Sequence, residues 1–117
     1  MTGRLMRRSA ALLVVAAAAI AASSAPAAAK NCDIGNSRSY GTTYVIEISV
    51  SGVSCAKGKR VIRAFHDCRP GKTGRCPRGS GYRCSERRFN KSPQSYDSDV
   101  TCKRGAKRVT HTYTQFT

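Results

Sequence analysis

Basic side chains gather in several stretches of this chain and could bind an anionic partner. Lysine and arginine supply 21 of the 117 residues, against six acidic residues, for a formal net charge of +15. Such a charge attracts polyanions at long range, whether nucleic acid, a cell-wall polymer, an acidic polysaccharide or lipid headgroups. The sequence predicts that a polyanion binds around a turn near the carboxyl terminus and around an upstream loop. The residues assigned to this surface are Lys103, Arg104, Lys107, Arg108, Arg69, Lys72, Arg75 and Arg78.

Three aromatic residues, Tyr82, Phe89 and Tyr96, lie between the basic stretches and could stack on nucleic-acid bases. No recognised nucleic-acid-binding motif accompanies them. A second interpretation of the charge is compositional, since a positive surface also keeps an exported protein in solution. Charge gives the sign of a partner and not its identity, so the sequence leaves both interpretations open.

Two histidines, His66 and His111, make a small secreted ribonuclease the first alternative function. One imidazole could act as general base and the other as general acid, while a neighbouring cation stabilises the phosphorane. Each histidine also has a structural role open to it. His66 falls in the last turn of a predicted helix, where a cation favours the helix dipole, and His111 shares a strand face with Val109 and Tyr113.

The nine residues from Cys68 to Cys76 suggest the second alternative, a serine-protease inhibitor. A disulfide would close this loop and offer Lys72 or Arg75 to a trypsin-like pocket. Two glycines within the loop argue against this function, because an inhibitory loop has to be stiff.

The remaining residues predict no cofactor and no metal site. The acidic side chains are scattered, the histidines are isolated in the sequence, and no Cys-x-x-Cys pair occurs. The Gly71-Lys72-Thr73 triplet follows a helix and lacks the glycine spacing of a phosphate-binding loop. We therefore expect a non-catalytic binding protein rather than an enzyme.

Six cysteines in a short exported chain predict a disulfide framework. Six cysteines allow 15 connectivities, among which the sequence does not choose. The pairing preferred here joins Cys68 to Cys76, Cys84 to Cys102 and Cys32 to Cys55.

Residues 1–29 have the pattern of an export signal that is removed from the mature protein. Arg4, Arg7 and Arg8 precede an apolar run over 10–22, and Ala27-Ala28-Ala29 supplies a cleavage site. The run is shorter than the ~20 apolar residues that a membrane span needs. We expect a secreted, monomeric single domain over 30–117, without a transmembrane segment. Three basic residues and no acidic ones lie in 1–29, so this domain carries a net charge of +12.

The first element that positions the candidate residues is a helix over 54–68. Ser54 is a typical N-cap residue, and the residues at 58, 61, 62, 65 and 68 recur with helical spacing. Gly58 weakens a helix by ~1 kcal/mol relative to alanine. Its expected purpose is therefore the close approach of a strand or of a disulfide. Pro70 and Gly71 end the helix.

The other predicted elements are strands. Tyr44, Ile46, Ile48 and Val50 alternate with the residues between them, which places these four on one buried face. A short strand begins at 81–84, a long polar connection follows over 85–99, and a hairpin joins 100–102 to 107–116 through a turn at 103–106. One amphipathic helix requires one apolar sheet face. The predicted fold class is α+β, with the helix packed on a small antiparallel sheet that ends in a C-terminal hairpin and is stabilised by disulfides.

Three segments of the chain resemble a group of small exported, cysteine-containing proteins of actinobacteria. These segments are Val53-Ser54-Cys55-Ala56 with Arg60-Val61-Ile62-Arg63-Ala64-Phe65, Gly81-Tyr82-Arg83-Cys84, and Thr101-Cys102-Lys103-Arg104-Gly105-Ala106-Lys107-Arg108-Val109. The resemblance covers most of the region 53–113. It implies export and a cysteine-started helix, a glycine-aromatic-x-cysteine strand and a final hairpin. It implies no activity and no functional residues.

Overall fold

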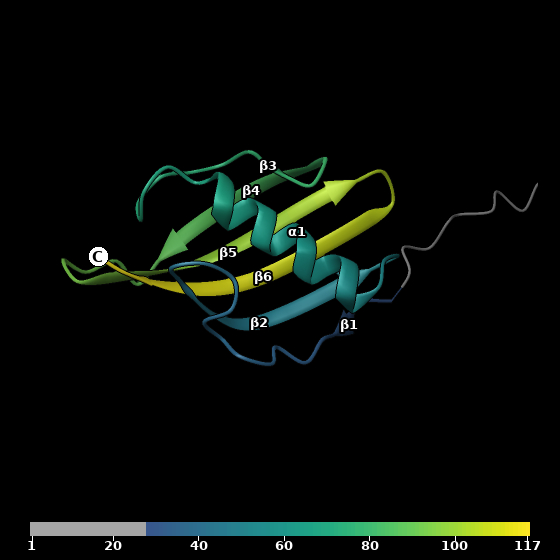
Figure 1. The fold of residues 1–117 in the computed structure, drawn as a ribbon, viewed down its shortest axis with the longest axis horizontal. Coiled ribbons are helices and arrows are strands. Elements are labelled where there is room, and N and C mark those ends of the chain that lie inside the picture. Colours follow the sequence, from purple (N-terminus) through teal and green to yellow (C-terminus); the bar gives the residue numbers. More distant parts are fainter. Residues whose placement is uncertain (1–27) are drawn as a thin grey trace, which may run out of the picture.

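The computed structural model describes residues 28–117. The predicted export signal over 1–29 lies, apart from Ala28 and Ala29, outside the described residues. The described chain forms one helix on a six-stranded antiparallel sheet (Figure 1), which confirms the predicted fold class. The elements are β1 (Lys30–Asn31), β2 (Tyr44–Ser51), α1 (Cys55–Cys68), β3 (Arg78–Gly79), β4 (Tyr82–Phe89), β5 (Ser95–Arg104) and β6 (Lys107–Phe116).

The strand order across the sheet is β1-β2-β6-β5-β4-β3, so the last strand of the chain lies near the middle. Helix α1 lies across one face of the sheet (Figure 1). No other helix or strand of residues 28–117 covers the opposite face, which we call the outer face. The hairpin between β5 and β6 turns through two residues, and Gly105 has a φ of 57° there, which glycine adopts without strain.

Two predicted features of α1, the N-cap at Ser54 and the close contact at Gly58, are found in the structure. The side chain of Ser54 accepts a hydrogen bond of 3.1 Å from the backbone nitrogen of Lys57, as an N-cap does. A Cβ atom added to Gly58 would lie 2.5 Å from Cγ1 of Val50 in β2. Close approach of a strand, one of the two predicted reasons for this glycine, is therefore confirmed.

The end of α1 differs from the prediction, because Cys68 is exposed and does not continue the buried stripe. The buried positions there are His66 in the helix and Arg69 just after it, which are 8% and 7% exposed. Both polar side chains have hydrogen-bond partners beneath the helix, and this makes their burial tolerable. Apolar periodicity could not indicate two buried polar residues.

The structure of β2 corrects the prediction that residues 44, 46, 48 and 50 share one buried face. A β-bulge between Val45 and Glu47 shifts the register against β6. Val45 is consequently buried together with Ile48 and Val50, whereas Ile46 is 54% exposed. A bulge inserts one residue, so every side chain before it changes face relative to strict alternation.

The predicted long polar connection over 85–99 is wrong. Most of it belongs to two long strands, β4 and β5, which pair along β4 from Arg83 to Phe89. The polar sequence concealed them, because the outer face is solvated and the inner face carries the charged residues Glu86 and Arg88. These side chains are only 3% and 10% exposed.

The three disulfides join Cys32 to Cys55, Cys68 to Cys76 and Cys84 to Cys102, which confirms the preferred pairing. They tie both ends of α1 to the rest of the domain and link the neighbouring strands β4 and β5. Three disulfides in a small domain are typical of oxidising, non-cytoplasmic compartments. Within residues 28–117, α1 has neither the length nor the apolar composition that a membrane crossing requires.

Candidate functional site

Four basic side chains form a row across the outer face of the sheet. The antiparallel registers pair Arg78 with Arg83, Arg83 with Lys103, and Lys103 with Arg108. Their strand neighbours Gly79, Cys84, Cys102 and Val109 are buried against the helix side, so the four charges point away from α1. Because adjacent strands lie ~4.8 Å apart, the row is about 14 Å long. We call Arg78, Arg83, Lys103 and Arg108 the cationic row.

The cationic row has no internal compensation. All four residues are exposed, and within the described part of the chain none of their side chains forms an ion pair or a hydrogen bond. Like charges directly opposite each other on neighbouring strands are destabilising. A bound anion that lies across the cationic row would therefore offset the repulsion between its four like charges.

Three shallow hollows adjoin the cationic row, and no acidic residue lines any of them. A hollow of about 460 Å³ at the β5–β6 turn is lined by Lys103 and Arg108, and the remaining two lie toward β3 and β4. One, of about 640 Å³, is lined by Arg78 and Arg83 together with the β3–β4 turn. The other, of about 380 Å³, lies between β4 and β5 and is lined by Arg83, Ser85, Thr101 and Lys103. This last hollow thus combines two cations with two hydroxyl groups.

The remaining residues of the predicted polyanion surface lie elsewhere. Arg104 and Lys107 face each other across the β5–β6 turn, on the opposite side of the hairpin from the cationic row. Lys72 and Arg75 are exposed on the Cys68–Cys76 loop, where Arg75 lies 3.7 Å from Glu86.

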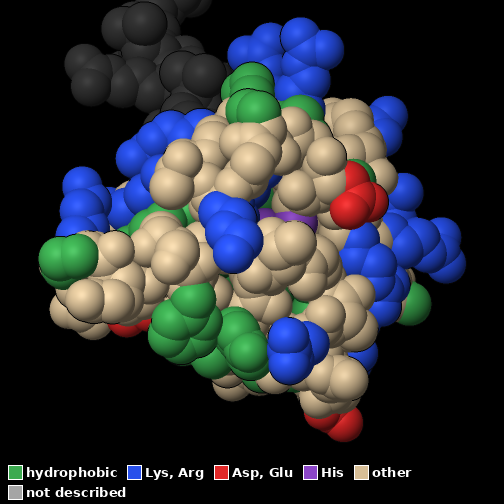
Figure 2. Space-filling view, turned by 60° about the vertical axis from the view of Figure 1, so that its left-hand side comes forward, with side chains coloured by type: hydrophobic (Ala, Val, Ile, Leu, Met, Phe, Trp, Pro, Cys, Tyr) green, Lys and Arg blue, Asp and Glu red, His purple; other side chains and the backbone are tan. Residues whose placement is uncertain are grey.

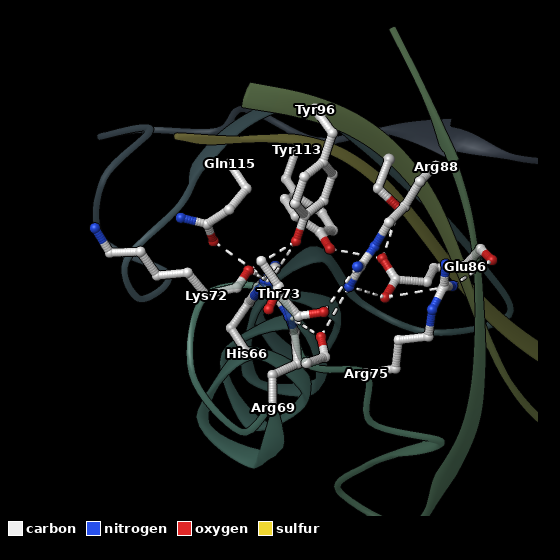
Figure 3. Close-up of polar contacts among 12 residues, drawn as sticks. His66, Arg69, Lys72, Thr73, Arg75, Glu86, Arg88, Tyr96, Tyr113 and Gln115 are labelled. Carbon is white, nitrogen blue, oxygen red and sulfur yellow. Dashed lines mark hydrogen bonds and ion pairs between the residues drawn. The ribbon is translucent and has the colours of Figure 1, made fainter. Parts of the chain in front are cut away.

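Arg69 is removed from the predicted surface, because it is buried beneath the end of α1 (Figure 3). Its guanidinium donates hydrogen bonds to the backbone oxygens of Lys72 and Gly74, to Nδ1 of His66 and to the hydroxyl of Tyr96. These contacts occupy the donors that an external anion would need. Arg69 supports the loop from inside and is not available to a polymer.

His66 and His111 are brought together, with 2.9 Å between their Nε2 atoms. Both are buried, and only a sliver of histidine surface is visible between the side chains in Figure 2. Burial, together with the charge of Arg69, lowers the pKa of His66 to about 3. Burial also lowers the pKa of His111, and the neighbouring His66 and Arg69 add to this effect. A general acid and a general base have to reach the substrate, so the burial of these two imidazoles against each other does not favour a ribonuclease site.

A second buried group of polar residues lies next to the histidines (Figure 3). Glu86 accepts hydrogen bonds from the hydroxyls of Tyr113 (2.6 Å) and Ser98 (2.7 Å) and from Arg88 (2.9 Å). Burial alone would raise the pKa of Glu86, but these hydrogen bonds outweigh it and hold the pKa below its ordinary value. Glu86 and Arg88 therefore compensate each other's charge, and both carboxylate oxygens of Glu86 already have partners.

The Cys68–Cys76 loop is held from inside by two arginines. Arg88 donates to the backbone oxygens of Thr73 (2.7 Å) and Gly74 (2.8 Å), while Arg69 and Tyr96 donate to that of Lys72. A protease has to draw the carbonyl oxygen of the residue in its pocket into an oxyanion hole. The carbonyl oxygen of Lys72 is already engaged, so the geometry does not favour Lys72 as an inhibitory residue.

Sequence reasoning missed Arg83, the member of the cationic row that connects β3 to β5. A signal was present, since Arg83 precedes Cys84 and Lys103 follows Cys102. If a disulfide joins those cysteines across an antiparallel pair, their neighbours Arg83 and Lys103 face each other on the opposite side of the sheet.

The fold and the site define a small, basic, disulfide-linked α+β domain with an uncovered sheet face. Comparison of the chain with protein-family models, curated proteins and solved structures found no match. The resemblance to small exported actinobacterial proteins stays a prediction.

Proposed function

We propose that the protein is a secreted, monomeric, non-catalytic binding protein that holds a linear anionic polymer on the outer face of its sheet. The cationic row carries this proposal, because four exposed cations that have no side-chain partner among residues 28–117 lie side by side across four strands. The net charge of +12 on residues 30–117 adds a long-range attraction for any polyanion. The three disulfides suit the extracellular location that the export signal predicts.

The proposal is tested by retention of the oxidised protein on an immobilised anionic polymer such as heparin. The variant Arg83→Gln/Lys103→Gln removes the middle of the cationic row and should elute at clearly lower salt than the wild type. The control Lys59→Gln/Arg60→Gln removes the same charge from α1, on the other side of the domain, and should elute close to the wild type. Equal shifts for both variants would show that net charge, and not the cationic row, binds the polymer.

Salt dependence provides a second measurement on the same proteins. Each phosphate of a flexible strand that is neutralised contributes about −0.7 to the slope of log K against log salt. Four contacts therefore predict a loss of affinity of roughly 50-fold between 50 and 200 mM salt. In Arg83→Gln/Lys103→Gln the slope should fall by about half.

A further inference from the structure

We infer that the polymer is a polyol phosphate, with its phosphates on the cationic row and its free hydroxyls bound by Ser85 and Thr101. This inference rests on the proposed function and names the chemical class of its ligand. The inference starts from a second row of side chains on the outer face, which lies two residues along each shared strand from the cationic row. The registers pair Ser85 with Thr101, Thr101 with Thr110, and Thr110 with Ser49, so across β4, β5, β6 and β2 this row consists of hydroxyl side chains.

Ser85 and Thr101, which lie beside the middle of the cationic row, are two members of the hydroxyl row that are free to bind a ligand. Their side chains have no hydrogen-bond partner within the described part of the chain, whereas Thr110 donates to the backbone oxygen of Ser49. Both line the hollow of about 380 Å³ that also contains Arg83 and Lys103. Two residues along a strand correspond to about 6.7 Å, so one hollow offers cations at one side and hydroxyls at the other.

This combination fits a chain in which charged phosphodiesters alternate with neutral hydroxyl-bearing units. Arginine and lysine supply donors for the phosphate oxygens. A hydroxyl of serine or threonine both donates and accepts, and can therefore bond a polyol hydroxyl in either direction. A polyphosphate without carbon has no group that would use Ser85 and Thr101.

Single-stranded nucleic acid fits the same surface less well, because sites that bind it combine cations with aromatic side chains on which the bases stack. The outer-face aromatic residues Phe89, Tyr44 and Phe116 lie at the far end of the strands. Phe89 is six residues along β4 from Arg83, a distance of about 20 Å. Between them the face carries the acidic residues Glu47 and Asp99, which line a separate hollow, and Asp99 is paired with Arg87 at 3.2 Å, so this stretch offers a polyanion no continuous run of free cations.

The test compares three probes at matched numbers of phosphates: poly(glycerol phosphate), inorganic polyphosphate and oligo-deoxythymidine. The variant Ser85→Ala/Thr101→Val removes both hydroxyls and leaves every charge in place. It should bind poly(glycerol phosphate) about tenfold more weakly, as expected for two lost hydrogen bonds. Its affinity for inorganic polyphosphate should equal that of the wild type. The control Ser37→Ala/Thr42→Val makes the same changes in the segment before β2 and should bind all three probes as the wild type does.

The outcomes separate this inference from the proposed function. If Ser85→Ala/Thr101→Val binds poly(glycerol phosphate) like the wild type, or if oligo-deoxythymidine is the tightest probe, the polyol phosphate inference is wrong and the cationic row stands. If Arg83→Gln/Lys103→Gln binds all three probes like the wild type, the proposed site is wrong. Circular dichroism and thermal melting of each variant confirm that it remains folded.

Discussion

At the scale of single residues, Arg69 fixes the protonation of the buried histidines. A guanidinium donates and does not accept hydrogen bonds, so Nδ1 of His66 has to be the acceptor in its 2.9 Å contact with Arg69. His66 therefore carries its proton on Nε2 and donates it to Nε2 of His111. His111 in turn carries its proton on Nδ1, a buried atom without a hydrogen-bond partner in the described residues.

Neutral buried histidines predict a specific dependence of stability on pH. The unfolded chain binds protons on both imidazoles below their ordinary pKa of about 6.5, whereas the folded domain does not until the pH is far lower. The free energy of unfolding should therefore fall as the pH drops from 6.5, by ~1.4 kcal/mol per pH unit for each proton once the unfolded imidazoles are fully charged.

Urea unfolding between pH 7 and pH 5 measures this effect before most carboxylates titrate. The variant His111→Gln should show a shallower fall of stability than the wild type in that window. Imidazole resonances that titrate near pH 6.5 in the folded wild-type domain would contradict the assignment.

At the scale of elements, the contact between α1 and β2 depends on the absence of a side chain at position 58. Alanine favours a helix over glycine by ~1 kcal/mol, so propensity alone predicts that Gly58→Ala stabilises the domain. The structure predicts the opposite, since the new Cβ would lie 2.5 Å from Cγ1 of Val50. Val50 is 2% exposed and packed in the core, so it has little room to move.

Gly58→Ala should accordingly lower the free energy of unfolding by about 1–3 kcal/mol, the usual cost of an overpacked core. Truncation of the opposing side chain supplies the control. In a Val50→Ala background, Gly58→Ala should be neutral or stabilising, because the clashing methyl group is gone. If the effects of the two substitutions on the free energy of unfolding are additive in this double-mutant cycle, the contact with Val50 is not the reason that position 58 requires glycine.

At the scale of the whole molecule, the two faces of the sheet have different roles, one in stability and one in the proposed binding. Its inner face and α1 bury the aromatic, aliphatic and paired charged residues that hold the domain together. Its outer face is left to solvent, with the cationic row at the end nearest the β5–β6 turn. The basic residues can therefore be changed in pairs on the outer face without disturbing the core.

Disulfides carry much of the stability of such a short domain. The loss of chain entropy in the unfolded state assigns roughly 2.6 kcal/mol to Cys68–Cys76, 3.2 kcal/mol to Cys84–Cys102 and 3.5 kcal/mol to Cys32–Cys55. Their sum of ~9 kcal/mol is comparable with the whole net stability of a small domain, ~5–15 kcal/mol. Treatment with dithiothreitol should therefore unfold the protein, with loss of its far-UV circular dichroism spectrum. A spectrum that survives complete reduction would show that the core suffices without the disulfides.

The sequence by itself determined the features that depend on neighbours along the chain. The cap at Ser54, the apolar spacing of α1 from residue 58 to residue 65 and the β-branched run of β6 are local signals, and each is confirmed. The disulfide pairing was also anticipated, although spacing alone left 15 connectivities open. Where a local signal was weak, as in the polar strands β4 and β5, the sequence predicted a loop.

Apart from the cysteine pairs, only the tertiary structure decided which distant residues meet. The cationic row exists because three antiparallel registers align residues 78, 83, 103 and 108, and one slip of register would turn part of it inward. The pairing of His66 with His111 and the burial of Arg69 depend in the same way on where α1 crosses the sheet. Contacts between segments far apart in sequence follow from the packing of the whole domain, and no window of residues contains that information.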